Sequence, residues 1–228
     1  MSLQFFAAPS PNKTGVLIAP GGGYSYVSDE KEGFSPAKWL NERGFDAWVL
    51  SYTCAGDGHP RPIYPAPQRE ALDAVKKIRA EERVTKLGIW GFSAGGHLAA
   101  VTATTLEASL DFVVLAYPVI SMEYPITHPG SRQNLLGDGA PLELVQEMSA
   151  QNRVSEATPP AFIFHTANDG SVSVQNSLLF ATAMSQHQRP FEIFVLPDGP
   201  HGIGLALEDP KLTWTAELDR WLQGIITT

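Results

Sequence analysis

Short apolar runs alternate with helical patterns along most of this chain. The runs are nearly continuous in β-branched and other apolar residues, which is typical of parallel strands covered on both faces. A strand followed by a helix, repeated throughout, predicts a doubly wound, mostly parallel α/β sheet with right-handed crossovers. The predicted strands cover residues 16–19, 46–52, 86–90, 112–117, 161–166 and 191–196, and the N-terminal LQFFAA is a candidate edge strand.

The helices between these strands have recognisable ends. Ser35 predicts an N-cap with Pro36 as the first helical residue, and Gly44 is expected to end that helix. Asp209 and Pro210 are expected to start the last helix in the same way. The predicted apolar stripes contain Leu72, Val75 and Ile78 within residues 65–83, and Trp214, Leu218, Trp221, Leu222 and Ile225 in the last helix.

One connection is much longer than the others. Residues 119–160 separate two predicted strands and contain only a short amphipathic helical pattern near residues 141–148. Connections of this length in a compact domain are usually functional or disordered. We therefore expect a single domain over residues 1–228, with residues 119–160 forming a cap insertion over the carboxyl edge of the sheet.

Composition excludes several classes of partner. The 228 residues include 16 Lys and Arg against 24 Asp and Glu, a net charge of −8 without a basic cluster. Binding to nucleic acid or to an anionic membrane is therefore not expected. No apolar run is long enough to span a bilayer, and the N-terminal segment lacks the features of a signal peptide, so a cytoplasmic location is expected. Cys54 is the single cysteine, and no metal-ligand spacing is present, so neither a disulfide nor a metal is predicted.

The sequence GFSAG, residues 91–95, follows a predicted strand and opens a predicted helix. This is the context of the G-x-S-x-G nucleophile elbow, in which a tight turn exposes the serine hydroxyl. Small residues at such a turn also have a simpler interpretation, because they let a helix lie close to a sheet. The pattern makes Ser93 a candidate nucleophile that needs a base and an orienting acid.

Candidates for both partners follow later strands in the required order. Asp169 lies just after the strand at residues 161–166, in the loop sequence ANDGSVSV. His201 lies after the last strand, in PDGPHGIGL. Because the carboxyl ends of parallel strands share one edge of the sheet, we expect Ser93, Asp169 and His201 to meet there. A turn-forming role for Asp169 and a solvated loop position for His201 are the simpler alternatives.

Other titratable residues are weaker candidates for these roles. Glu123 is the best alternative acid, while Asp198 is expected to stabilise the turn before His201. His97 and His165 are expected to be structural, on a helix and within a strand. Asp111 precedes a strand and so belongs at the opposite edge of the sheet.

A glycine-rich loop follows the first predicted parallel strand, in the sequence APGGGYSYV. Backbone N–H groups of glycines can approach a ligand without obstruction by a Cβ atom. We predict that Gly22 and Gly23, together with the N–H of Ala94, donate to a developing oxyanion. A flexible glycine turn is the alternative, whereas a phosphate loop is excluded because no Gly-Lys-Ser/Thr follows.

Five motifs resemble those of α/β-hydrolase esterases related to acetyl xylan esterases, which are often labelled endo-1,4-β-xylanase B-like or sugar hydrolases. They are PGGGY, GFSAGGHLAA, GSRQNLLG, TPPAFIFHTANDGSVSVQNS and GPHGIGL, and the resemblance extends over residues 16–221. It implies the α/β-hydrolase fold, with Ser93 as nucleophile, Asp169 as acid and His201 as base. Pro20 stands where the HGGG signature has histidine, and Gln68 where related proteins often have an acidic residue.

The resulting hypothesis is a serine carboxylesterase that hydrolyses short acyl esters, above all acetyl esters on carbohydrates, without a cofactor. Tyr24, Tyr117 and His128 are the predicted substrate-binding residues, with Tyr26 nearby. Glycosidase activity is not expected, because no pair of carboxylates emerges. An amidase or formamidase with the same triad and a non-catalytic pseudo-hydrolase are the alternatives. The partner is expected to be a small-molecule ester, and the choice between monomer and homodimer stays open.

Overall fold

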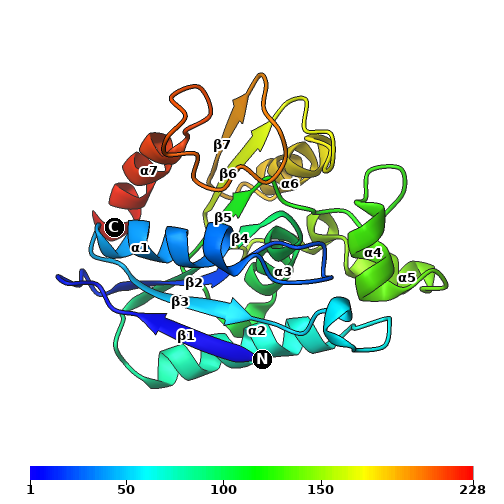
Figure 1. Ribbon diagram of the computed structural model, residues 1–228, viewed down its shortest axis with the longest axis horizontal. Helices are drawn as coiled ribbons and strands as arrows, with labels where there is room; N and C mark the ends of the chain where they lie inside the picture. The colour runs from blue at the N-terminus through cyan, green and yellow to red at the C-terminus, as the bar shows by residue number, and fades with distance from the viewer. Residues whose placement is uncertain (228) are drawn as a thin grey trace.

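The predicted strands form one seven-stranded sheet in the computed structural model, which describes residues 1–227 apart from the side chain of Asp57 (Figure 1). The strand order is β1-β3-β2-β4-β5-β6-β7, and every pair is parallel except β1 with β3. The N-terminal edge strand is thus confirmed, and its direction is antiparallel. The strands are β1 (Ser2–Phe6), β2 (Thr14–Ala19), β3 (Asp46–Ser51), β4 (Lys86–Phe92), β5 (Phe112–Ala116), β6 (Ala161–Thr166) and β7 (Phe191–Leu196).

Helices cover both faces of the sheet (Figure 1). Successive strand residues point to opposite faces, so Leu17 and Ile89 belong to one apolar core while Ile18 and Trp90 belong to the other. Buried residues of α2, α3 and α6 complete the first core, and those of α1 and α7 complete the second. The helices are α1 (Ser35–Asn41), α2 (Ala66–Ala80), α3 (Ser93–Ala103), α4 (Pro129–Leu136), α5 (Leu142–Glu147), α6 (Gln175–Gln186) and α7 (Thr215–Thr227).

Two predicted helix starts are wrong. Ser35 is not an N-cap, because a π-helical turn over Glu30–Phe34 precedes α1 and the Ser35 hydroxyl donates to Glu30 O within that continuous helix. Asp209 does not start the last helix, which begins at Thr215. The Asp209 carboxylate instead accepts a hydrogen bond from the backbone N–H of Lys211 in a local turn. Ser35 thus lies inside a helix that begins earlier in the chain, and Asp209 stabilises a turn that precedes α7.

The long connection over residues 119–160 contains more structure than the sequence indicated. α5 confirms the short helix near residues 141–148, but α4 was missed. Figure 1 shows both helices at the edge of the sheet where β2 and β3 end. Asn134 of α4 donates to the carbonyl of Gly23, which attaches this segment to the glycine-rich loop. The interpretation of residues 119–160 as a cap insertion in a single domain remains a proposal.

Within residues 1–227, none of the helices combines the length and the apolar character that crossing a bilayer would require.

Candidate active site

Ser93 occupies a sharp turn between β4 and α3. Its φ angle is +53°, in the left-handed region that costs a residue with a side chain about 1–2 kcal/mol. Strained backbone of this kind persists only where the surrounding structure holds it, and it is common at functional sites. The carbonyl of Ser93 accepts a hydrogen bond from the N–H of Val119, which fixes the turn to the segment after β5.

The glycines around Ser93 are required by close backbone packing. A Cβ atom on Gly95 would lie 2.1 Å from Ala19 O and 2.3 Å from Pro20 O, so α3 can approach the end of β2 only with glycine here. A Cβ on Gly91 would lie 2.2 Å from Gly95 O. Both interpretations of these glycines therefore hold together. The close approach of α3 to the end of β2 requires glycine, and it also forms the tight turn at Ser93.

Replacing Gly95 with alanine is expected to lower the free energy of unfolding by about 3 kcal/mol, because the new methyl group overlaps backbone oxygens that cannot move independently. Urea denaturation followed by circular dichroism measures the change. Gly224→Ala, in α7 where nothing lies within 4 Å of the added Cβ, is the matched control and should raise stability by up to about 1 kcal/mol. Equal stabilities for the two variants would contradict the packing argument.

The structure brings the three residues predicted at the ends of β4, β6 and β7 into one hydrogen-bonded chain. Ser93 Oγ lies 2.8 Å from His201 Nε2, and His201 Nδ1 lies 2.6 Å from Asp169 Oδ2. An ionised carboxylate only accepts hydrogen bonds, so Nδ1 of His201 carries the proton. Its Nε2 is then an acceptor for the serine hydroxyl. The site is equipped to remove a proton from Ser93.

The Asp169 side chain is completely buried and well supplied with donors. Its Oδ1 accepts hydrogen bonds from the backbone N–H groups of Ser171 and Val172, at 2.8 and 2.9 Å. Burial alone would raise the pKa of this carboxyl, but hydrogen bonds from His165, His201 and the two backbone N–H groups outweigh it, and the pKa lies well below the ordinary value of 3.8. Asp169 is therefore a permanent negative charge behind the imidazole.

The glycine-rich loop lies against the same cavity. Gly22 and Gly23 line it together with Ser93 and His201, and its volume is about 440 Å³. Both glycines have positive φ angles, 132° and 65°, which a residue with a side chain rarely adopts. Their N–H groups donate to no acceptor among the described residues. Ala94 is the second residue of α3, where helix N–H groups lack intrahelical acceptors.

Of the residues predicted near the substrate, Tyr26 lines this cavity, and so does His128. It is the N-cap of α4, and its Nδ1 accepts from the N–H of Ser131, so Nε2 carries the proton as a potential donor. The prediction for Tyr24 and Tyr117 is wrong, because both side chains are buried. Tyr24 donates its hydroxyl to His97, and Tyr117 donates to Glu32. A tyrosine after a parallel strand can point into the sheet as readily as into the cavity.

Glu32 is the residue that sequence reasoning missed. Its side chain is 5% exposed and lines the cavity, with Oε2 accepting from the N–H of Gly21 at 2.9 Å and Oε1 from the Tyr117 hydroxyl at 2.7 Å. The Tyr117 hydroxyl in turn accepts from the N–H of Gly204, and its ring lies edge-on to His201, with centroids 5.1 Å apart. Glu32 thus connects the glycine-rich loop to the loop that carries His201.

A sequence signal for Glu32 was present. Glu32 stands at helical spacing before Pro36, Trp39 and Leu40, which are all buried, so it falls on the buried stripe of that helix. Starting the helix at Ser35 left Glu32 outside the pattern. Burial raises the pKa of Glu32 above its ordinary value of 4.5, although the hydrogen bonds from Tyr117 and Gly21 and the neighbouring charges offset part of the effect.

The remaining candidates have structural partners. Glu123 accepts from Asn152, and Asp198 pairs with Asn168 on the surface. His97 is completely buried between Tyr24 and the carbonyl of Met148, and burial lowers its pKa to about 4. These contacts agree with structural roles for all three.

His165 and Asp111 lie at opposite edges of the sheet. His165 is buried as expected, yet its Nε2 also lies 3.4 Å from Asp169 Oδ2, so it supports the acid as well as the core. Asp111 accepts from the N–H of Leu87 at the start of β4, at the other edge from Ser93. The edge predicted for Asp111 is confirmed.

Residues 66–227 match the prolyl oligopeptidase family. The chain is 33% identical to the acetylxylan esterase of Xylanibacter ruminicola over 96% of its own length and 46% of that protein. It spans less than half the length of the curated relatives it matches.

This chain covers a larger share of several solved structures than of the curated relatives. The acetyl ester-xyloside bifunctional hydrolase from Caldicellulosiruptor lactoaceticus is 35% identical, with a TM-score of 0.89 over 98% of this chain and 87% of that one. A carboxylesterase from Lactobacillus plantarum is 27% identical, with a TM-score of 0.76 over 98% and 92%.

Proposed function

Because this chain belongs to the prolyl oligopeptidase family, we propose that it is a serine carboxylesterase that removes acetyl groups from carbohydrate esters. The predicted α/β-hydrolase fold and the resemblance to acetyl xylan esterases are confirmed by the relatives it matches. The observation that carries the proposed activity is the hydrogen-bonded chain from Ser93 through His201 to Asp169. Further support comes from two relatives, an acetylxylan esterase and an acetyl ester-xyloside bifunctional hydrolase.

In the first half of the reaction Ser93 is acylated. His201 Nε2 takes the hydroxyl proton while Ser93 Oγ bonds to the ester carbonyl carbon, and Asp169 holds and stabilises the imidazolium. The carbonyl π electrons move to the oxygen, which becomes an oxyanion. His201 then gives the proton to the alcohol oxygen as its bond to the carbonyl carbon breaks, leaving an acetyl-serine.

In the second half the acetyl-serine is hydrolysed. His201 takes a proton from water, whose oxygen attacks the acetyl carbonyl, and acetate leaves as Ser93 Oγ regains a proton from His201. In both halves the oxyanion is assigned to the N–H groups of Gly22, Gly23 and Ala94. Removing one such donor typically costs about 10²–10³-fold in kcat. The Nε2–H of His128 is assigned as a donor to a polar group of the substrate.

The carboxylates around the cavity favour ester over glycoside hydrolysis. Glycosidases use a pair of carboxyl groups that flank the scissile bond. Among the described residues that line the cavity with Ser93, Glu32 is the single carboxylate, and both of its oxygens already accept hydrogen bonds from Gly21 and Tyr117. We therefore assign the substrate as the ester of a sugar rather than its glycosidic bond.

A panel of p-nitrophenyl esters beside acetylated xylo-oligosaccharides tests the proposal. Turnover is expected to be fastest with acetate and to fall as the acyl chain lengthens, with acetate released from the oligosaccharide. Labelling of Ser93 by an organophosphonate probe excludes a non-catalytic pseudo-hydrolase. Failure of the protein both to hydrolyse p-nitrophenyl acetate and to react with the probe would overturn the assignment.

Amide hydrolysis is the second candidate, favoured by the match to a family named for an oligopeptidase. The same triad cleaves amides when His201 protonates the leaving nitrogen. Comparing turnover of an acetyl ester with that of an N-formyl or anilide substrate separates the two.

We also propose a cytoplasmic location for the protein. Light scattering distinguishes a monomer from a homodimer.

Replacing Glu32 with alanine is expected to lower both stability and activity. The N–H of Gly21 and the hydroxyl of Tyr117 lose their acceptor, which should reduce the free energy of unfolding by about 2–4 kcal/mol. Displacement of the glycine-rich loop should reduce kcat for an acetyl ester by about 10–100-fold. The measurements are urea denaturation and steady-state kinetics.

Glu30→Ala is the matched control, because Glu30 lies in the same helical turn but is exposed. It should change stability by less than about 0.5 kcal/mol. A Glu32→Ala variant with wild-type kcat would show that the glycine-rich loop does not depend on this carboxylate.

A further inference from the structure

A second cavity lies at the carboxyl end of β3. Its volume is about 540 Å³, within the range of about 300–1,000 Å³ that is typical of small-molecule sites. β3 runs parallel to β2, which pairs in turn with β4, the strand that leads to Ser93. Because the carboxyl ends of parallel strands share one edge, the cavity opens at the edge that carries the triad.

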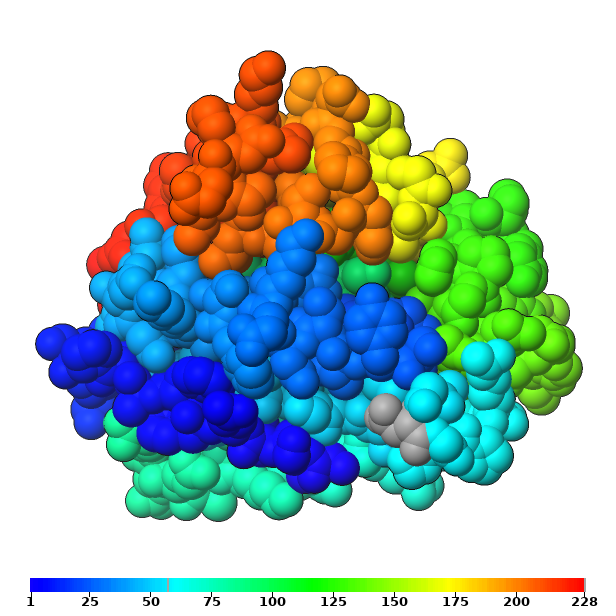
Figure 2. Space-filling view, viewed as in Figure 1, coloured from blue at the N-terminus to red at the C-terminus, as the bar shows by residue number. Residues whose placement is uncertain are grey.

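The loop after β2 separates this cavity from the one that contains Ser93. Gly22 lines the cavity with Ser93, and Asp29 lines the second cavity. Tyr26 lines both, and its side chain is 61% exposed. A molecule that extends from Ser93 into the second cavity would therefore contact Tyr26 on the way. Figure 2 shows this loop, in blue, beside the cyan segment after β3.

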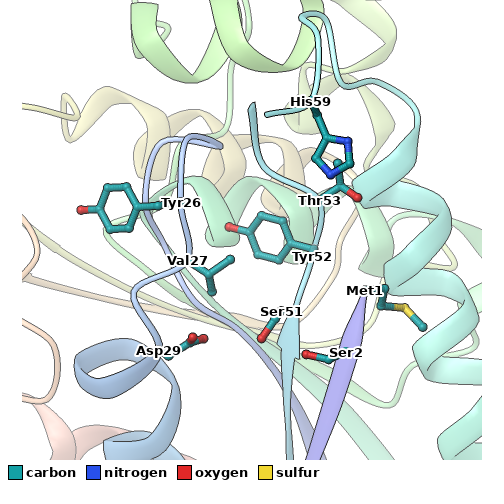
Figure 3. Close-up of a pocket in the computed structure, with 9 residues that line it drawn as sticks. All are labelled: Met1, Ser2, Tyr26, Val27, Asp29, Ser51, Tyr52, Thr53 and His59. Atoms are coloured by element: carbon teal, nitrogen blue, oxygen red, sulfur yellow. The ribbon is translucent and has the colours of Figure 1, made fainter. Parts of the chain in front are cut away.

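The lining of the second cavity matches a neutral, hydroxyl-rich ligand. Figure 3 shows Asp29 and Ser51 below the ring of Tyr52, with Tyr26 on one side and His59 at the far end. The Asp29 carboxylate belongs to this lining, and its Oδ1 accepts no hydrogen bond from any described residue. Neither lysine nor arginine occurs among the described lining residues, and the N-terminal amino group of Met1, which also lines the cavity, pairs with Glu70 at 3.6 Å. This charge distribution disfavours a phosphate or a carboxylate.

Aromatic rings beside hydrogen-bonding side chains suit a pyranose, which has apolar C–H faces and hydroxyl groups around its edge. The exposed Tyr26 offers such a face, and the Asp29 carboxylate accepts from hydroxyl groups. An anionic sugar would instead meet the negative charge of Asp29. The chemistry of the lining thus favours a neutral glycosyl unit.

We propose that this second cavity is a subsite for a neutral sugar unit of the substrate's alcohol portion, entered across Tyr26. The inference rests on the proposed function, because an acetyl group bound at Ser93 is too short to extend past Tyr26. Only the alcohol portion can then reach the second cavity. The subsite makes the enzyme an esterase for acetylated oligosaccharides rather than for small acetate esters.

The test compares two substrates, p-nitrophenyl acetate and acetylated xylotriose, in wild type, Tyr26→Ala and Asp29→Asn. The quantity measured is the ratio of kcat/KM for the oligosaccharide to kcat/KM for p-nitrophenyl acetate. This ratio is expected to fall about fivefold in Asp29→Asn, because Asp29 lines the second cavity and not the cavity of Ser93. It is expected to fall about tenfold in Tyr26→Ala, where the ring lines both cavities and the larger substrate loses more contact area than p-nitrophenyl acetate. Asp29→Asn preserves side-chain shape, and it decides the test if Tyr26→Ala does not fold.

Tyr124→Ala is the matched control, since Tyr124 is 64% exposed and its ring packs under Arg132 in the segment after β5. Its ratio should stay within about twofold of wild type. Ratios within twofold of wild type in both Tyr26→Ala and Asp29→Asn overturn the subsite while leaving the esterase assignment intact. A wild-type protein that releases acetate from neither substrate overturns the proposed function, and the subsite with it.

Discussion

Replacing Ser93 with alanine should lower kcat/KM for an acetyl ester by about 10⁴-fold or more, because the acyl-enzyme can no longer form. The change removes Ser93 Oγ, which lies 2.8 Å from His201 Nε2. No other hydroxyl in the described structure forms a hydrogen bond with that nitrogen. The residual rate would come from the oxyanion donors and substrate binding. Steady-state kinetics with p-nitrophenyl acetate measure the loss.

The fold should survive this change. Ser93 makes its main contacts through the backbone turn, and alanine adds no atoms to it. The midpoint of thermal unfolding is therefore expected to stay within about 4 °C of wild type. Ser185→Ala, at an exposed position of α6, is the control and should keep full activity. Near-normal turnover by a folded Ser93→Ala protein would contradict the mechanism.

Replacing Asp169 with asparagine should reduce kcat by about 10⁴-fold while leaving the geometry in place. The asparagine oxygen can still accept from the N–H groups of Ser171 and Val172. Its NH₂ group would then donate to His201 Nδ1, which forces the imidazole proton onto Nε2. An imidazole protonated at Nε2 cannot take the proton of Ser93.

The same variant should change how stability depends on pH. The pKa of Asp169 lies below its ordinary value of 3.8 in the folded protein, so folding favours the ionised form. Its contribution to stability is complete above about pH 4 and is lost as the pH falls through the range below 3.8. Asp169→Asn should be less stable than wild type at pH 7, and this difference should shrink in acid.

Urea denaturation at several pH values, together with kinetics, measures both effects. Asp198→Asn is the matched control, because Asp198 is exposed and pairs with Asn168 rather than with His201. It should retain activity within a few-fold. If Asp198→Asn loses as much activity as Asp169→Asn, the acid has been assigned to the wrong residue.

Much of the fold could be predicted from the sequence, because its signals are short-range. Continuous apolar runs mark strands buried on both faces, and β6 and β7 have the bounds that the pattern predicted. Ser93 directly follows such a strand, and Asp169 and His201 lie in the loops that follow two others. Parallel strands bring their carboxyl ends to one edge, so these three residues could be placed together before any contact was known.

Signals that depend on packing between distant segments were missed or misinterpreted. α4 has little amphipathic pattern, and it is held in place by contacts such as the one from Asn134 to Gly23. Tyrosine is common at binding surfaces, and Tyr24 and Tyr117 are therefore predicted to belong to one. Both side chains are instead buried, with the Tyr24 hydroxyl bonded to His97 and the Tyr117 hydroxyl bonded to Glu32. The local sequence does not determine whether a tyrosine side chain at such a position points into the cavity or into the core.

The sequence by itself determined the parallel sheet and the order of the three candidate catalytic residues, because strand patterns and strand ends are local properties of the chain. Only the tertiary structure revealed the contacts of Glu32 with Gly21 and Tyr117 and the second cavity beside Tyr26. Both features are formed by segments that are far apart in the chain. Their positions are fixed by long-range packing and hydrogen bonds, which no single stretch of residues encodes.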